Sequence, residues 1–255
     1  MKKWSKLLWV FTLLFFISCS EDENDENEVT LLNVTLNFSH NWDGEEVTNA
    51  DFNTLKYTNA NGEQMSIELL RYLISNITFK PLEAERIAID GYNLVDVTNN
   101  SGLSMTINDD ISAGTYEIAF TFGFDNEDNS DGAYLDLNSA SWNVPMMLGG
   151  GYHYMQLEGK YLATDATEVG YQYHAIRAVD ITGDEPRFQD TFFEVNLGTI
   201  TITEDTTITV DMNIAEWFKN PNQWDLNVLG QQLMPNFNAQ VMMFENGQNV
   251  FQLAN

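Results

Sequence analysis

The sequence predicts an all-β fold, an antiparallel β-sandwich of Greek-key-like topology with a few short helical turns. Short candidate strands with alternating apolar residues recur along the chain, polar turns separate them, and very few stretches show helical periodicity. Short strands joined by short turns, with few helices, are typical of two packed antiparallel sheets. The chain shows no internal repeat, heptad pattern or second-domain boundary, so we expect one β domain over residues 29–255.

Residues 1–18 have the pattern of a lipoprotein signal peptide. A basic start precedes an apolar run from Leu7 to Ile17 that is too short to span a bilayer, and small residues lead to Cys19. Residues 16–19 resemble a bacterial lipobox, so we expect cleavage before Cys19, lipidation of that residue and attachment to the membrane through the lipid. A cleaved secretory signal or a short uncleaved anchor are the alternatives. Lipidation would leave the mature chain without a thiol for a disulfide, a metal or catalysis.

Residues 19–28 predict an acidic disordered tether, because like charges repel and nothing apolar is there to bury. Residues 20–22 resemble the surface-export signals of Bacteroidetes lipoproteins, so we expect an outer-membrane lipoprotein that faces the periplasm or the cell surface. Loss of three leader lysines leaves 8 basic against 38 acidic residues, a net charge of −30. Such a charge disfavours nucleic acid and anionic lipid as partners.

The first half of the domain is expected to contain short strands between polar turns. Alternating apolar residues predict a strand over Val29–Phe38, and the polar residues after it predict a turn that holds His40 and Trp42. An Asn-Gly pair at 61–62 predicts a tight turn. β-branched and aromatic residues then predict strands within 65–82, 87–97 and 116–124, and residues 125–137 predict a polar loop.

The second half is expected to follow the same pattern. Aromatic and apolar residues predict a strand over Tyr152–Leu157, stopped by Gly159. Further strands are expected over 171–176, 187–195, 198–202 and 206–212, and Ile214–Lys219 predicts one helical turn.

The stretch Ser141–Gly159 carries the most informative loop. Pro145 and three consecutive glycines exclude a regular helix or central strand, yet the loop holds Trp142, Met146 and Met147. Apolar residues in a loop are costly to leave in water, so we expect this loop to pack back over the sheet and to be a place for a site. The alternative is that these residues only close one end of the sandwich.

Metal binding is the chemistry that the residue types best allow. The nitrogen ligands available are His40, His153 and His174, and imidazole together with the thioethers of a methionine-containing chain points to copper. Two of these histidines lie on different strands and can meet one ion only if the strands are neighbours and both rings face the same side. We do not expect calcium in the loop after residue 124, because its acidic residues match no EF-hand spacing.

Catalysis is not indicated. The chain lacks a Gly-x-Ser-x-Gly elbow, a free cysteine and a glycine-rich phosphate loop before a helix, and 38 acidic residues make any carboxylate pair uninformative. We therefore expect a protein that is not an enzyme, and we keep a hydrolase only as a minor alternative.

Several segments resemble the MbnP-like domain family. The most specific are the Tyr-Leu-Ile-Ser-Asn-Ile run over 72–77 and the Trp…Gly-Tyr…Leu-Glu-Gly spacing over 142–159, and the resemblance covers roughly residues 30–251. It implies a β-rich periplasmic or surface protein that binds copper through histidines. It also implies that a tryptophan near the metal is oxidised to kynurenine by a partner di-haem enzyme of the cytochrome c peroxidase class.

The resemblance also implies particular site residues. His40 corresponds to the early family histidine, His174 to the Tyr-His of a middle strand, and Trp142 to the tryptophan before the Gly-Tyr strand. Trp42 is the second choice for a modified residue, and His153 is left as a third ligand. The chain departs from the family pattern around Trp142 and after His174, which keeps open a metal-free β-sandwich binding module of an outer-membrane complex as the alternative.

Overall fold

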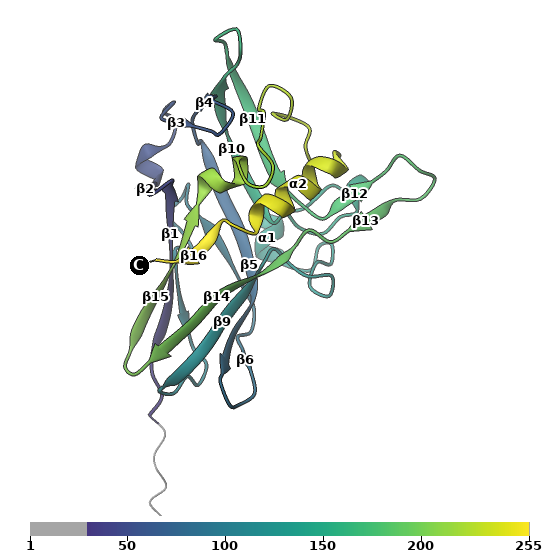
Figure 1. Ribbon diagram of the computed structural model, residues 1–255. Coiled ribbons are helices and arrows are strands. Elements are labelled where there is room, and N and C mark those ends of the chain that lie inside the picture. Colours follow the sequence, from purple (N-terminus) through teal and green to yellow (C-terminus); the bar gives the residue numbers. More distant parts are fainter. Residues whose placement is uncertain (1–29, 255) are drawn as a thin grey trace, which may run out of the picture.

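Residues 30–254 are described by the computed structural model as two packed β-sheets with short helices at one side (Figure 1). The all-β sandwich is thereby confirmed. The expectations for the signal peptide, Cys19 and the tether concern residues outside the described part of the chain. Within residues 30–254, no helix is long and apolar enough to cross a membrane.

The smaller sheet has the strand order β16-β15-β1-β2, and β8 also pairs with β1. Its strands are β1 (Val34–Trp42), β2 (Glu45–Glu46), β8 (Ser104–Ile107), β15 (Thr206–Asn213) and β16 (Phe251–Leu253).

The larger sheet has the order β14-β9-β5-β10-β4-β3, with β11 on β10 and β6 and β7 on β5. Its strands are β3 (Tyr57–Thr58), β4 (Gln64–Met65), β5 (Leu69–Pro81), β6 (Ile87–Ala88), β7 (Tyr92–Asp96), β9 (Gly114–Phe122), β10 (Met155–Leu162), β11 (Glu168–Ala175) and β14 (Phe193–Ile202). A separate hairpin joins β12 (Ala178–Asp180) and β13 (Arg187–Gln189). The helical segments are η1 (Asn49–Asp51), α1 (Leu135–Ser139), η2 (Met146–Leu148), η3 (Ile214–Phe218) and α2 (Phe237–Gly247).

The first strand begins and ends later in the chain than predicted, at Val34 and Trp42, and the predicted turn at His40 is wrong. β1 continues through Trp42 and pairs in parallel with β15, so the sandwich is not purely antiparallel. Ser39 Oγ donates a hydrogen bond of 2.8 Å to Asp211, and the Asn41 amide donates to the other oxygen of that carboxylate. The polar residues that suggested a turn therefore form the outward row of a strand, because side chains alternate across it.

Gly159 does not stop its strand, which is a second correction. β10 begins at Met155, after the predicted start, and runs through Gly159 to Leu162. A β-carbon at Gly159 would overlap the carbonyl oxygen of Ser66 on the neighbouring segment. Glycine is present there because two backbones approach each other closely.

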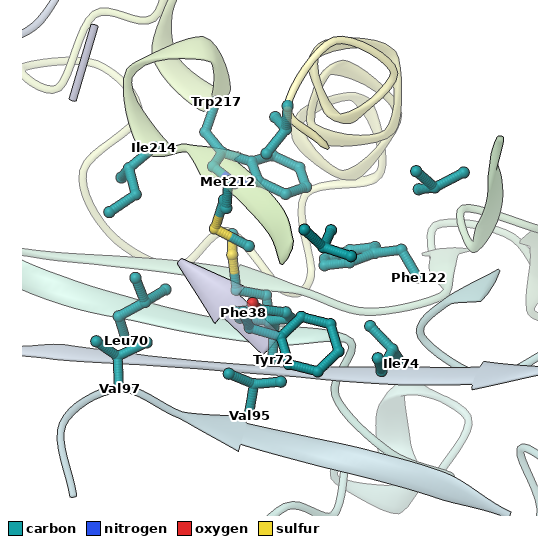
Figure 2. Packing of buried hydrophobic residues seen from close by; sticks show 14 of the residues in the cluster. Phe38, Leu70, Tyr72, Ile74, Val95, Val97, Phe122, Met212, Ile214 and Trp217 are labelled. Carbon is teal, nitrogen blue, oxygen red and sulfur yellow. The ribbon is translucent and has the colours of Figure 1, made fainter. Parts of the chain in front are cut away.

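The core lies between the two sheets and is rich in aromatic rings. Figure 2 shows Tyr72 of β5 and Phe122 of β9 facing Met212 of β15 and Trp217 of η3. The rings of Phe122 and Trp217 have centroids 5.2 Å apart. Burial of large apolar side chains is the main stabilising contribution to such a sandwich.

The helix α2, which the sequence did not predict, packs on β11, β12 and η3 (Figure 1), and its Ala239 and Met243 are buried in the core of the sandwich. Asn236 caps its first turn by accepting a hydrogen bond from Ala239 N at 3.1 Å. Two of its buried side chains, Gln240 and Asn246, are polar amides. These interrupt the apolar periodicity by which a helix is recognised in a sequence.

Candidate metal centre

The register of the larger sheet sorts the candidate residues onto its two faces. Arg71, Gln156 and His174 lie directly opposite one another on β5, β10 and β11. The next residue on β5, Tyr72, points the other way, into the core. His174 therefore lies on the outer face of the sheet, which the loop after β9 and the segment before α2 cover.

The loop 140–153 closes over this outer face. Trp142 is fully buried with Leu73, Phe124, Leu137 and Tyr152. His153 N donates a hydrogen bond of 2.9 Å to the carbonyl oxygen of Trp142, which ties the two ends of the loop together. The expectation that the loop packs back on the sheet is confirmed for Trp142.

Met146 and Met147 do not follow that expectation. Their side chains are 70% and 74% exposed on the single turn η2. The turn leaves Pro145 and ends at three glycines with φ of +100°, +67° and +78°. This backbone buries Leu148 and directs the two methionines before it into solvent.

His153 and His174 meet on the outer face. Their ring centroids are 5.2 Å apart, and the planes are nearly perpendicular at 82°. His153 lies two residues before the strand β10 and not on it, as the sequence had predicted, but β10 pairs with β11, and the two rings meet on the same side. The structure brings together two of the three predicted nitrogen ligands.

The hydrogen bonds of His153 fix which of its nitrogens is free. Its Nδ1 lies 2.8 Å from the carbonyl oxygen of Trp142, and because a carbonyl only accepts, Nδ1 carries the hydrogen. Burial lowers the pKa of His153 to about 4, so the ring is neutral at pH 7. Its Nε2 then presents a lone pair, 3.3 Å from the sulfur of Met234.

His174 is held in a similar way by a carboxylate. Its Nε2 lies 2.7 Å from Glu158 Oε1, and the hydrogen bond from His174 lowers the pKa of Glu158 despite partial burial. An ionised carboxylate accepts, so in the neutral ring Nε2 carries the hydrogen and Nδ1 keeps its lone pair. Metal-binding histidines almost always donate their other N–H to a carboxylate or carbonyl in this manner.

Met234 was not singled out from the sequence as a site residue. It lies about 80 residues from His153, in an irregular segment before α2, and it packs on the buried cluster of Val144, Leu148, Ile176 and Val179. In residues 30–254 no three His, Cys, Asp or Glu side chains gather as metal ligands. The Met234 thioether is the sulfur that contacts His153. No local sequence signal distinguishes Met234 from the other methionines.

Gln240 of α2 links the backbone of His174 to that of Leu233, the residue before Met234. Its side-chain amide is buried and donates to the carbonyl oxygens of His174 at 2.8 Å and Leu233 at 3.1 Å. Its Oε1 accepts from Ile176 N at 2.8 Å. The amide thus sets the position of Met234 relative to His174.

Gln240→Leu is expected to lower the free energy of unfolding by about 2–4 kcal/mol, because three buried backbone groups lose their partner. Urea denaturation monitored by tryptophan fluorescence measures this loss. Gln248→Leu, at the exposed end of the same helix, is the matched control and should change stability by less than about 0.5 kcal/mol. Equal effects of the two substitutions would contradict the role of Gln240.

Arg71 lies against the buried tryptophan. Its guanidinium carbon is 5.0 Å from the Trp142 ring centroid, its Nε donates to Gln156 at 2.8 Å, and its Nη1 donates to the Ala140 carbonyl oxygen at 3.0 Å. Among the described residues, Trp142 Nε1 has no hydrogen-bond partner although it is buried. The indole is thus in contact with the Arg71 cation and with the His153 ring, whose centroid is 5.8 Å away.

His40 and Trp42 lie elsewhere, inside the sandwich. His40 Nε2 is 3.1 Å from the hydroxyl of Tyr72 on the core face of the larger sheet. Trp42 stacks on Tyr57 at 4.9 Å and on Phe218 at 5.9 Å between ring centroids. The sheet separates His40 from His174, so the structure does not bring these two predicted ligands together.

The buried histidines make stability depend on pH. Burial lowers the pKa of His40 to about 4, whereas an unfolded histidine titrates near the usual 6.5. Above pH 6.5 His40 is neutral in both the folded and the unfolded chain, and the stability gained by burying the neutral ring is fully present. As the pH falls from 6.5 towards 4, the unfolded chain takes up a proton that the folded chain does not, and the contribution is lost.

Between pH 7 and 4.5, metal-free His40→Gln protein should therefore lose about 2–3 kcal/mol less stability than the parent chain. Urea denaturation of both proteins at the two pH values measures this. Acid also protonates carboxylates and so relieves the repulsion between negative charges, which stabilises the folded chain. This effect acts on both proteins alike and cancels when they are compared. Identical losses in the two proteins would show that His40 titrates normally when folded.

The fold and the site define a β-sandwich protein with a small histidine–methionine cluster on the outer face of its larger sheet. The MbnP family model matches residues 32–243, and the chain belongs to the MbnP family. Its structure is similar to that of MbnP from Methylosinus trichosporium, with a TM-score of 0.50 and 12% sequence identity over 76% of this chain and 80% of that one. No curated protein sequence matches this chain. At this identity, the structural similarity concerns the fold alone.

Proposed function

We propose that this chain is a copper-binding protein, not an enzyme, whose ligands are His153 Nε2, His174 Nδ1 and Met234 Sδ. The observation that carries the proposal is the contact of His153 Nε2 with the Met234 thioether, next to the ring of His174, with each imidazole oriented by a hydrogen bond of its other nitrogen. Two imidazoles and a thioether favour copper over the hard cations calcium and magnesium.

The distance between two of the donors, His153 Nε2 and Met234 Sδ, fits a shared metal ion. Ligands at about 2.0 Å for nitrogen and about 2.3 Å for sulfur, placed tetrahedrally, are about 3.5 Å apart. Nitrogen and sulfur are 3.3 Å apart in His153 and Met234. Glu158 supplies a negative charge behind His174, which strengthens that nitrogen as a ligand. A copper ion bound at this site would serve copper storage or electron transfer.

Trp142 is the tryptophan that this geometry favours for oxidation to kynurenine by a partner di-haem enzyme of the cytochrome c peroxidase class. The support for this proposal is its contact with the His153 ring and its carbonyl hydrogen bond to that residue. Trp42 lies on the other side of the larger sheet, in the core stack, and we no longer favour it. The chain would be held at the outer membrane through a lipid on Cys19, with the domain in the periplasm or at the cell surface.

The test is the metal content and peptide map of the protein purified from its native host. We expect about one copper per chain, as one donor cluster implies. We expect conversion of Trp142, with loss of one carbon and gain of one oxygen, and an unmodified Trp42. Protein that contains no copper and takes up none when it is offered would exclude this function and favour a metal-free binding module.

A further inference from the structure

Two sequence-adjacent methionines, Met146 and Met147, stand on the surface of the turn whose next residue, Leu148, lies in the buried cluster on which Met234 packs. Met146 and Met147 are exposed, whereas Met65, Met155 and Met212 are fully buried. An exposed methionine gives up the free energy of burying its side chain. Among residues 30–254 these are the only two exposed methionines, so they are the thioethers that solvent reaches most readily.

The backbone holds this pair in place. Leu148 N donates to the Pro145 carbonyl oxygen at 2.7 Å, and Gly149 N donates to that of Met146 at 3.0 Å, which closes the turn η2. Gly151 N donates to the carboxylate of Asp131 at 3.2 Å, which fixes the glycine segment to the preceding loop. The backbone that carries the two methionines is therefore a hydrogen-bonded turn.

The turn is connected to the metal centre through the buried residue that follows it and through the two ends of its loop. Leu148, the residue after Met147, lies in the buried cluster on which Met234 packs. The loop that carries the turn runs from Trp142 to His153, and these residues are hydrogen-bonded to each other at the centre. His153 itself is only 4% exposed, so an ion reaches it only after passing the residues around it.

We propose that Met146 and Met147 form an entry site at which Cu(I) first binds, before it passes to Met234, His153 and His174. This inference rests on the proposed function. Thioethers select the soft Cu(I) ion. Each transfer exchanges one copper–ligand bond for another, with no change in oxidation state. No proton is released, because the thioethers have none and each imidazole binds through a nitrogen that carries none. The partner is a complex of Cu(I) that gives up its ion to sulfur ligands.

The test measures how fast the protein takes Cu(I) from its coloured bicinchoninate complex, under anaerobic reducing conditions. In the Met146→Leu/Met147→Leu protein, which keeps the apolar surface but lacks the two sulfurs, we expect the transfer rate to fall about tenfold. The final amount of bound copper should not change. Met242→Leu, a half-buried methionine of α2, is the matched control and should transfer at the parental rate.

The outcomes separate the entry site from the metal centre itself. An unchanged rate in the double variant, with copper still bound, would overturn the entry site and leave the proposed function in place. A parent chain that binds no Cu(I) would overturn both. A loss of final copper in the double variant would show that these sulfurs belong to the resting site, and would also overturn a role confined to entry.

A second measurement observes the entry site without the centre. Ag(I), a redox-inert substitute for Cu(I), is titrated into His153→Ala/His174→Ala protein carrying ¹³C-methyl methionine. We expect the methyl resonances of Met146 and Met147 to shift, because their sulfurs remain exposed. Shifts confined to other methionines would contradict the proposal.

Discussion

Replacing both His153 and His174 with alanine is expected to weaken copper binding at least a thousandfold. Removing a residue that merely orients a ligand costs about 10–100-fold in affinity, and here two ligands themselves are lost. Cu(I) affinity measured by competition with a chelator gives this ratio. Because both side chains lie on the outer face, the core of the sandwich should remain folded, which circular dichroism checks.

His40→Gln is the control for this experiment. His40 bonds to Tyr72 inside the sandwich and lies on the opposite face of the larger sheet from His174. Its replacement should leave copper affinity within about twofold of the parent, as expected for a distant independent site. A large loss with His40→Gln and a small loss with the double alanine protein would reverse the ligand assignment.

Gly159→Ala is expected to cost at least about 3 kcal/mol, the upper part of the range for overpacked interiors, and to lower the melting temperature by about 10 °C. A β-carbon there would overlap the backbone oxygen of Ser66 and crowd the Tyr171 ring. The neighbouring backbone belongs to a strand-paired segment and cannot rotate away as a flexible side chain can. Thermal denaturation followed by circular dichroism measures the effect.

Gly170→Ala is the matched control for Gly159→Ala. Gly170 lies on the adjacent strand β11, opposite Lys160, and a β-carbon there would meet nothing closer than 3.9 Å. Alanine also orders the unfolded chain slightly, so stability should be unchanged or rise by about 0.5 kcal/mol. If both substitutions cost the same, the close approach at Gly159 is not what requires glycine.

The strands that follow a strict alternation could be predicted from the sequence. The alternation of apolar residues over 116–124 predicted one buried face formed by Tyr116, Ile118, Phe120, Phe122 and Phe124. The first four lie in the core on β9, whereas Phe124 follows the end of the strand and packs with Trp142 in a separate cluster. The end of β1 could not be predicted, because the polar side chains of Ser39 and Asn41 donate hydrogen bonds to Asp211, which is distant in sequence. A polar row on a strand and a polar turn have the same composition.

The site was predictable only in part, for a similar reason. Two histidines on separate strands can share an ion only if the strands pair, and pairing is a property of the whole sheet. His153, two residues before β10, meets His174 on the paired strand β11, whereas the side chain of His40 points into the core. Met234 joins them through the packing of a segment that has no regular structure, which no local pattern encodes.

X-ray absorption at the copper edge of protein loaded with one Cu(I) tests the central claim most directly. The ligand set His153, His174 and Met234 predicts two nitrogens at about 2.0 Å and one sulfur at about 2.3 Å. The sulfur contribution should disappear in Met234→Leu protein and persist in Met242→Leu protein. A spectrum without sulfur in the parent chain, or a sulfur contribution that survives Met234→Leu, would contradict the site described above.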